Sequence, residues 1–185
     1  MKTFKLYNEK LLIHRAIQND REAQQQLFAR HSPKMLGICR QYVKDIHHAE
    51  DLLLSGFLKV FTKLSTFKHE GSFEGWIRRI MVNTCISHLR KKNLVDLYDE
   101  DFVFSEVATE SLENTSVTDI QKLIDDLPEG YKIVFNLFAI EGFKHSEIAS
   151  KLGISISTSK TQLFRARKLL QKKYNTMNTL VHGNK

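Results

Sequence analysis

The residues that most clearly indicate a chemical role form a basic, hydroxyl-rich run near the carboxyl end of the chain. Between His145 and Arg167 the pattern is typical of a helix-turn-helix, in which Ala149 is small where two helices cross and Gly153 supplies the turn. The second helix is expected to present outward a set of polar and cationic side chains, whose positive strip Lys168 continues: Ser157, Thr158, Lys160, Thr161, Gln162, Arg165 and Lys168. Hydroxyl groups and lysine suit phosphate, arginine suits guanine and glutamine suits adenine. The run therefore predicts binding to duplex DNA, and the alternative is an ordinary helical hairpin with a solvated basic face.

A second constellation combines aromatic and basic residues between Phe73 and Arg90. Arg79, Asn83 and Arg90 lie near one face of a helix by their spacing. A face that mixes such groups with nearby aromatic rings can hold and stack unpaired bases. The alternative is a core tryptophan, Trp76, beside solvated arginines, and the residues alone leave both interpretations open.

A third set of residues indicates a surface for a protein partner. Leu54 and Leu58 lie one helical turn apart, away from the main apolar stripe of their helix and beside Asp51. Exposed leucines at that spacing favour docking of another helix. The alternative is that both leucines belong to a wide core stripe.

The helices that must carry these groups follow from composition and periodicity. The chain has 185 residues but only two prolines, which favours helix throughout. We expect an all-α fold of two small helical domains, at 8–93 and 117–174, followed by a tail at 175–185. Residues 94–116 are rich in Asp, Glu, Ser and Thr without a helical period, and are predicted to be an acidic linker.

The charge distribution supports the same division. Residues 1–93 carry a net charge of +9, residues 94–130 a net −10 and residues 131–185 a net +8, within a total of +7. Basic surfaces neutralise phosphates and release counterions, whereas an acidic block is repelled from the same duplex. The pattern therefore predicts two nucleic-acid contacts separated by a spacer.

Several classes of protein are disfavoured. Cys39 and Cys85 have apolar neighbours and no CxxC partner, so we expect small buried side chains in a reducing compartment and no metal site. The sequence contains no phosphate-binding glycine loop, nucleophile elbow or HExxH motif, so an enzyme is disfavoured. The start of the chain is charged and no apolar run could cross a bilayer, which predicts a cytoplasmic protein without direct membrane insertion.

Taken together, these motifs resemble those of a known family. The segments 49–61 and 73–90 resemble region 2 of bacterial RNA polymerase sigma factors, and 127–167 resembles region 4. The two regions in series, without an intervening domain, are similar to the extracytoplasmic-function (ECF) group of the sigma-70 family. The resemblance covers roughly four-fifths of the chain.

The resemblance assigns roles to the three sets of residues. It implies binding of the β′ clamp helices of core RNA polymerase by Asp51, Leu54, Phe57 and Leu58. It implies capture and melting of the −10 promoter element by Phe67, Lys68, Ser72, Trp76, Arg78, Arg79, Asn83, Arg90 and Lys91. The helix from Ser157 to Arg165 would read the −35 element, the polymerase β flap would be a further contact, and the linker would thread polymerase channels used by RNA.

The resemblance also implies that catalysis belongs to the core enzyme, with no active site or cofactor here, and that an anti-sigma protein controls the chain. Some positions depart from the family pattern. Leu54 stands where glutamine is usual, and Ser157, Ser159 and Gln162 stand where glycine, valine and arginine are frequent. The alternative function is a free-standing regulator that occupies duplex operators without polymerase and uses its amino-terminal helices for dimerisation or sensing.

Overall fold

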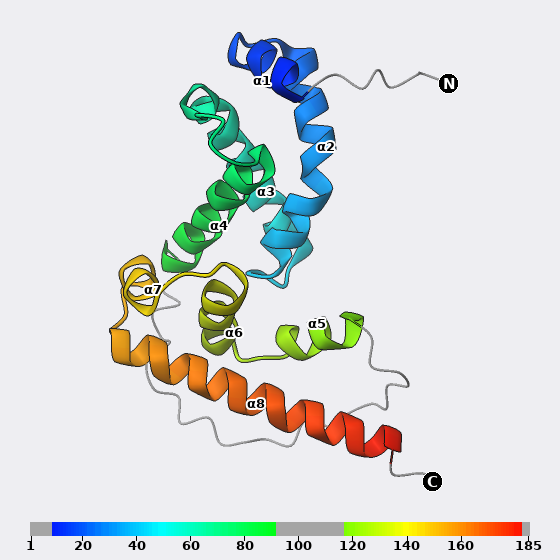
Figure 1. Ribbon diagram of the computed structural model, residues 1–185, viewed down its shortest axis with the longest axis vertical. Helices are drawn as coiled ribbons and strands as arrows, with labels where there is room; N and C mark the ends of the chain where they lie inside the picture. Colours follow the sequence, from blue (N-terminus) through cyan, green and yellow to red (C-terminus); the bar gives the residue numbers. More distant parts are fainter. Residues whose placement is uncertain (1–8, 92–116, 183–185) are drawn as a thin grey trace. The chain divides into compact units, whose positions relative to one another are not determined.

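The computed structural model describes residues 9–91 and 117–182, and every regular element in these two ranges is a helix (Figure 1). The chain divides into two compact units, Met1–His88 and Leu89–Lys185, with helix α4 crossing the division at its last turn. The predicted all-α fold class is confirmed. The segment predicted to be an acidic linker, 94–116, lies outside the described residues.

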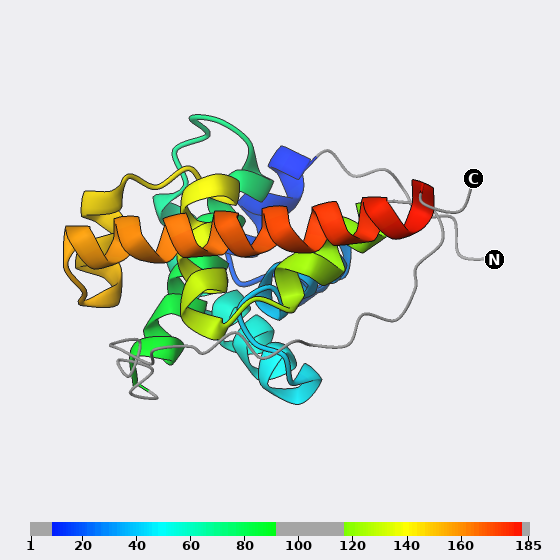
Figure 2. The same cartoon turned by 90° about the horizontal axis from the view of Figure 1, so that it is seen from below.

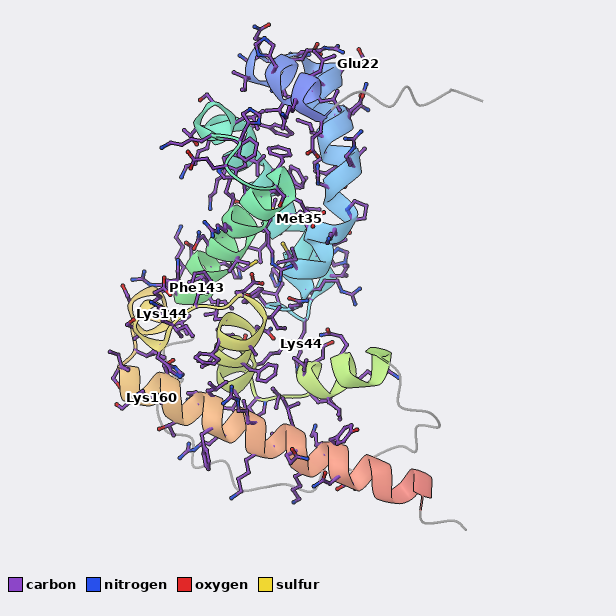
Figure 3. The ribbon with its side chains drawn as sticks, viewed as in Figure 1. Glu22, Met35, Lys44, Phe143, Lys144 and Lys160 are labelled. Carbon is purple, nitrogen blue, oxygen red and sulfur yellow. The ribbon has the colours of Figure 1, made fainter. Side chains whose placement is uncertain are left out.

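The first unit consists of α1 (Glu9–Ile17), α2 (Arg21–Arg40), α3 (Ile46–Lys63), the short 3₁₀ helix η1 (Leu64–Thr66) and α4 (Phe73–Lys91). Helices α1 and α3 both pack against α2. The core is apolar, and its largest fully buried side chains include Leu12, Leu27, Met35, Ile77 and Met81. Figure 3 shows Met35 on the inner side of α2. These helices therefore bury one face each, as their apolar spacing predicts.

Aspartates determine where α2 and α3 begin. The Asp20 carboxylate accepts hydrogen bonds from the backbone N–H groups of Glu22 (3.0 Å) and Ala23 (3.1 Å), and the Arg15 side chain donates to it at 2.7 Å. The Arg15 guanidinium and these N–H groups lower the pKa of Asp20. Asp45 caps α3 in the same way, accepting from the His48 N–H at 2.9 Å. Both caps satisfy backbone donors that a helix start leaves unpaired.

Helix α2 continues through Pro33 without a break. Proline removes one backbone hydrogen bond, to the carbonyl group four residues earlier, at Ala29. Pro33 and Ala29 are both exposed, so water can reach that carbonyl. Residues 21–40 thus form a single helix despite the proline.

Helices α3 and α4 approach each other closely at Gly56. A Cβ atom at this position would lie 2.2 Å from the Met81 sulfur and 2.8 Å from its methyl carbon. The Lys59 ammonium group also donates to the Thr84 hydroxyl at 3.1 Å, which joins the same two helices. Gly56 is therefore required by packing, not by backbone conformation.

The second unit consists of α5 (Val117–Asp125), α6 (Glu129–Phe135), η2 (Asn136–Ile140), α7 (His145–Leu152) and α8 (Ile156–His182). Helices α5, α6 and α7 all contact α8, and Figure 1 shows them on one side of it. Helix α6 begins directly after Pro128 and continues into the π-helix η2 at Asn136. The buried Lys132 side chain pairs with Asp125 at 2.9 Å and so holds α5 against α6.

Helix α8 is longer than the sequence predicted. The second domain was expected to end at 174, before a tail at 175–185, but the helix continues to His182 as one unbroken element (Figure 2). The Gln171 amide donates to Asn175 at 2.9 Å, and the Thr176 hydroxyl donates to the Lys172 carbonyl at 3.0 Å. No proline or glycine occurs between Ile156 and His182, so nothing in the sequence interrupts the backbone hydrogen bonds of α8. Within the described ranges, no helix is both long and apolar enough to cross a bilayer.

The close approach at Gly56 gives a stability prediction. Gly56→Ala should lower the free energy of unfolding by about 1–2 kcal/mol, because the fully buried Met81 must repack to admit the methyl group. The matched control is Gly37→Ala in α2, where a Cβ meets nothing within 4 Å. This control should gain about 0.5–1 kcal/mol from helix propensity. Urea unfolding followed by the fluorescence of Trp76, the single tryptophan, measures both changes. Equal effects of the two substitutions would contradict the packing argument.

Candidate nucleic-acid interface

Helices α7 and α8 form the predicted helix-turn-helix. Gly153 ends α7 in the left-handed conformation, with φ 74° and ψ 28°, which favours glycine. Its N–H group donates to the Ala149 carbonyl at 2.9 Å, and the Ile154 N–H donates to the same carbonyl at 3.1 Å. Ile148, Ala149 and Leu152 are buried on the inner side of α7. Gly153 therefore has the role in the turn that the sequence predicted.

A cluster of hydroxyl groups begins α8. The Ser155 hydroxyl accepts from the Thr158 N–H at 2.9 Å, and it lies 2.7 Å from the Ser157 hydroxyl and 2.8 Å from that of Thr158. Ser155 thus caps the helix, a role that sequence reasoning missed, although a serine just before a helical period is the usual signal. The positive end of the helix dipole and these hydroxyl groups together favour an anion such as phosphate.

Most of the predicted reading residues lie on the open side of α8. Thr158 is half-buried, and the exposed members of the set are Ser157, Lys160, Thr161, Arg165 and Lys168. Figure 3 shows Lys160 near the start of the helix. Three cations and three hydroxyl-bearing residues therefore share one helix, an arrangement that can contact phosphates and base edges.

Gln162 is the exception, and the prediction that it faces outward was wrong. Its side chain is only 8% exposed. Gln162 follows Ser159 by three residues and precedes Ala166 by four, and both of these are fully buried. The helical period therefore carries Gln162 to the inner side of α8, where it cannot reach the edge of a base.

Phe164 takes a place on the open face that the sequence analysis did not assign. Its ring is 66% exposed. It lies three residues after Thr161 and four before Lys168, so the same period that placed those two residues outward also predicts its position. An exposed aromatic ring among cations adds an apolar contact to the face.

An aromatic cluster lies where the loop before α4 meets the start of that helix. The ring centroid of Phe67 lies 4.7 Å from that of His69, 5.2 Å from Phe73 and 5.4 Å from Trp76. Phe73 and Trp76 are stacked, with centroids 5.8 Å apart. Phe73 is buried, whereas Phe67 and Trp76 are half-buried. Trp76 is therefore neither a core residue nor fully solvated, and its open side offers a surface on which a base can stack.

Basic and amide groups extend from this cluster along α4. At about 100° per residue, Arg79, Asn83 and Arg90 lie within about 40° of one another around the helix. All three are exposed, as are Lys68 and Lys91, and Arg78 is half-buried. Ser72 has a different local role, because its hydroxyl accepts from the Gly75 N–H at 3.1 Å at the start of α4. The predicted combination of arginine, asparagine and aromatic groups thus lies on α4 and on the loop before it.

The third surface lies on α3. Leu54 and Leu58 are 58% and 70% exposed, and Asp51 beside them is also exposed. Phe57 differs from the prediction, since it is only 2% exposed and its ring centroid lies 4.7 Å from that of Phe28 in α2. The helix turns Phe57 toward the core, where it supports the exposed leucines without offering its own side chain.

The two cysteines are core residues, as predicted. Cys39 of α2 and Cys85 of α4 are fully buried, and their thiols are hydrogen-bonded to each other. This contact and burial together raise the pKa of Cys85. Within the described ranges, no group of three or more His, Cys, Asp or Glu side chains is placed to hold a metal ion.

Comparison with known proteins finds two family models that match the chain in series. The model of Sigma-70 region 2 matches residues 27–95, and the model of Sigma-70, region 4 matches residues 118–170. The first match includes the aromatic cluster and the exposed leucines. The second includes the complete helix-turn-helix.

Curated relatives match nearly the whole chain. The RNA polymerase sigma-H factor of Pseudomonas aeruginosa is 28% identical over 87% of this chain and 91% of its own length. The ECF RNA polymerase sigma-E factor of Haemophilus influenzae is 27% identical over 89% of this chain and 94% of its own. The ECF RNA polymerase sigma factor SigW of Bacillus subtilis is 28% identical over 88% and 96%. The chain is therefore similar to these proteins along both units.

The geometry of the turn gives a prediction that needs no nucleic acid. Gly153→Ala should lower the free energy of unfolding of the second unit by about 1–2 kcal/mol, because φ is positive at this position. Gly153→Asn should cost less, since asparagine tolerates the left-handed region better. Thermal unfolding followed by circular dichroism compares the three proteins. A turn that accepts alanine and asparagine equally would contradict the assignment.

Proposed function

Since the chain belongs to the sigma-70 family of RNA polymerase sigma factors, within its extracytoplasmic-function group, we propose that it binds core RNA polymerase and directs the enzyme to specific promoters. The observation that carries this proposal is the match of regions 2 and 4 in series over two separate helical units. Each matched unit presents an exposed surface whose side chains suit one of the two promoter elements. The protein contributes specificity, and the polymerase contributes catalysis.

In this proposal α8 reads the −35 element in the major groove. The exposed Arg165 suits guanine, Lys160 and Lys168 suit phosphates, and the hydroxyl groups of Ser157 and Thr161 suit either phosphates or base edges. The helix start, capped by Ser155, would lie near a phosphate of the backbone. Because Gln162 is buried, we do not assign it a base.

The aromatic cluster and the open face of α4 are proposed to hold the −10 element after its strands separate. Phe67 and Trp76 offer partly open rings, on which unpaired bases can stack. Arg79, Asn83 and Arg90 line the same helix, so they can contact the phosphate backbone of a single strand that leaves the cluster. Stacking favours unpaired bases over a closed duplex, which is the chemical basis of melting.

The exposed leucines of α3 are proposed to dock on the β′ clamp helices. Leu54 and Leu58 would be buried on association, and Asp51 can pair with a cation at the rim. Phe57 would support this surface without contacting the clamp, because its contact with Phe28 holds α3 in place. The second unit is proposed to bind the β flap, and the acidic segment 94–116 to pass through channels otherwise used by RNA.

Regulation and location complete the proposal. An anti-sigma protein that covers these surfaces would keep the chain from the polymerase, and both interactions place it in the cytoplasm. Run-off transcription with purified core polymerase over a library of genomic fragments tests the whole proposal. Initiation at a defined set of promoters is the expected result, and failure of the chain to bind the core enzyme in a pull-down would falsify it.

The partner surface gives a specific prediction. The double substitution of Leu54→Ser and Leu58→Ser should weaken core binding by at least about tenfold, because both large apolar side chains leave the interface. Leu11→Ser is the matched control, since Leu11 is 47% exposed on α1 and has no assigned role. Fluorescence anisotropy with core polymerase measures the affinities. Equal loss in the control would exclude a specific docking role for α3.

The reading helix gives a second prediction. Arg165→Ala should cost about 1–3 kcal/mol at one base pair of the −35 element and relax specificity there, if its guanidinium holds a guanine. Lys168→Ala, one helical turn away, should weaken binding by a similar amount on every sequence and reduce the salt dependence. Competition binding to promoters with single base-pair changes separates the two patterns. Uniform weakening by Arg165→Ala would make it a phosphate contact instead.

A further inference from the structure

A hydrogen bond joins the starts of the two helices in the helix-turn-helix. The Nδ1 atom of His145, the first residue of α7, lies 2.9 Å from the hydroxyl oxygen of Ser159 in the first turn of α8. Ser159 is fully buried, so its hydroxyl group has no access to water. A buried hydroxyl that lost this partner would carry the cost of its desolvation.

The imidazole ring of His145 is held from a second side. It stacks on Phe138 of η2, with centroids 4.6 Å apart and planes at 26°. The Arg167 guanidinium lies over the same phenylalanine ring, at 5.5 Å from its centroid. Burial, together with the positive charges of Lys160 and Arg167, lowers the pKa of His145 and so favours the neutral ring. One imidazole therefore contacts η2 and α8 from the start of α7.

The position of Ser159 makes this contact relevant to recognition. Ser159 lies two residues after Ser157 and two before Thr161, and two residues correspond to about 200° around a helix. The hydrogen bond thus attaches α8 on the side opposite its exposed face. Outward side chains extend several ångströms beyond the helix axis, so a rotation of about 10° would displace their ends by about 1 Å. A hydrogen bond between a side chain and a base tolerates little displacement of that size.

We propose that His145 and Ser159 are positioning residues, which set the rotation of α8 and thereby the discrimination among −35 sequences without touching DNA. The inference rests on the proposed function and deepens it. The hydrogen bond depends on the serine at position 159, because valine, which is frequent at this position in the family, could not form it. The buried hydroxyl replaces nonspecific apolar contact with a directional one.

The test uses full-length protein assembled with core polymerase, on a selected promoter and on copies with single base-pair changes in the −35 element. His145→Ala and Ser159→Ala should each reduce the preference for the selected promoter about three- to tenfold, the effect of one hydrogen bond. The double variant should be no worse than either single one, since both remove the same bond. Affinity for unrelated duplex DNA should stay unchanged in all of them.

Two further variants separate positioning from a general loss of structure. His145→Asn retains a group that can bond to Ser159 and should restore most of the preference. Ser150→Ala, on the exposed side of α7, should leave the preference as it is. Thermal unfolding of each variant is measured in parallel. Should His145→Ala unfold the unit, Ser159→Ala, which removes a single oxygen atom, still decides the question.

Three results would overturn the inference: wild-type preference in both single variants, additive losses in the double variant, or a loss that matches the loss of nonspecific binding. The proposed function fails separately, if the wild-type chain does not direct core polymerase to any promoter. In that case the same variants are compared by direct binding to selected and altered duplexes. A wild-type chain that discriminates in neither assay would overturn both.

Discussion

The inward stripe of each helix is the constraint on which the other features of this protein depend. A helix in a small unit can bury only one face, and the residues on the remaining faces become available for partners. In α3 the buried line through Ala49, Gly56 and Val60 leaves Leu54 and Leu58 outside. In α8 the buried line through Ser159 and Ala166 leaves the cations outside. Core packing therefore determines which side chains form the exposed surfaces of α3 and α8.

Polar contacts at helix starts complete this arrangement. Asp20, Asp45, Ser72 and Ser155 each accept hydrogen bonds from backbone N–H groups where a helix begins. These caps determine the residue at which each helix starts. The cap at Ser155 has a second consequence, because it leaves the amino terminus of α8 surrounded by hydroxyl groups. Local stability and anion binding thus use the same atoms.

The two units present different chemistry, which suits the two states of DNA that they meet in the proposed function. The first unit gathers partly open aromatic rings beside arginine and asparagine, which suits unpaired bases. The second presents a helix with short polar and basic side chains, which suits the major groove of a closed duplex. A polar contact such as that of His145 with Ser159 matters in the second unit, because reading base edges requires a fixed helix rotation. Stacking in the first unit tolerates more movement.

Periodicity and composition by themselves determined much of this protein: the helical fold class, the helix-turn-helix with Gly153 at its turn, the exposed leucines of α3 and the buried cysteines. These features depend on local spacing, which the chain carries in any conformation. Tertiary packing decided the rest. It turned Phe57 and Gln162 inward, because neighbouring helices determine the exact edge of a buried stripe. It also brought His145 to Ser159 and Phe67 to Trp76, since contacts between separate elements depend on how helices cross, and spacing along one helix does not specify that.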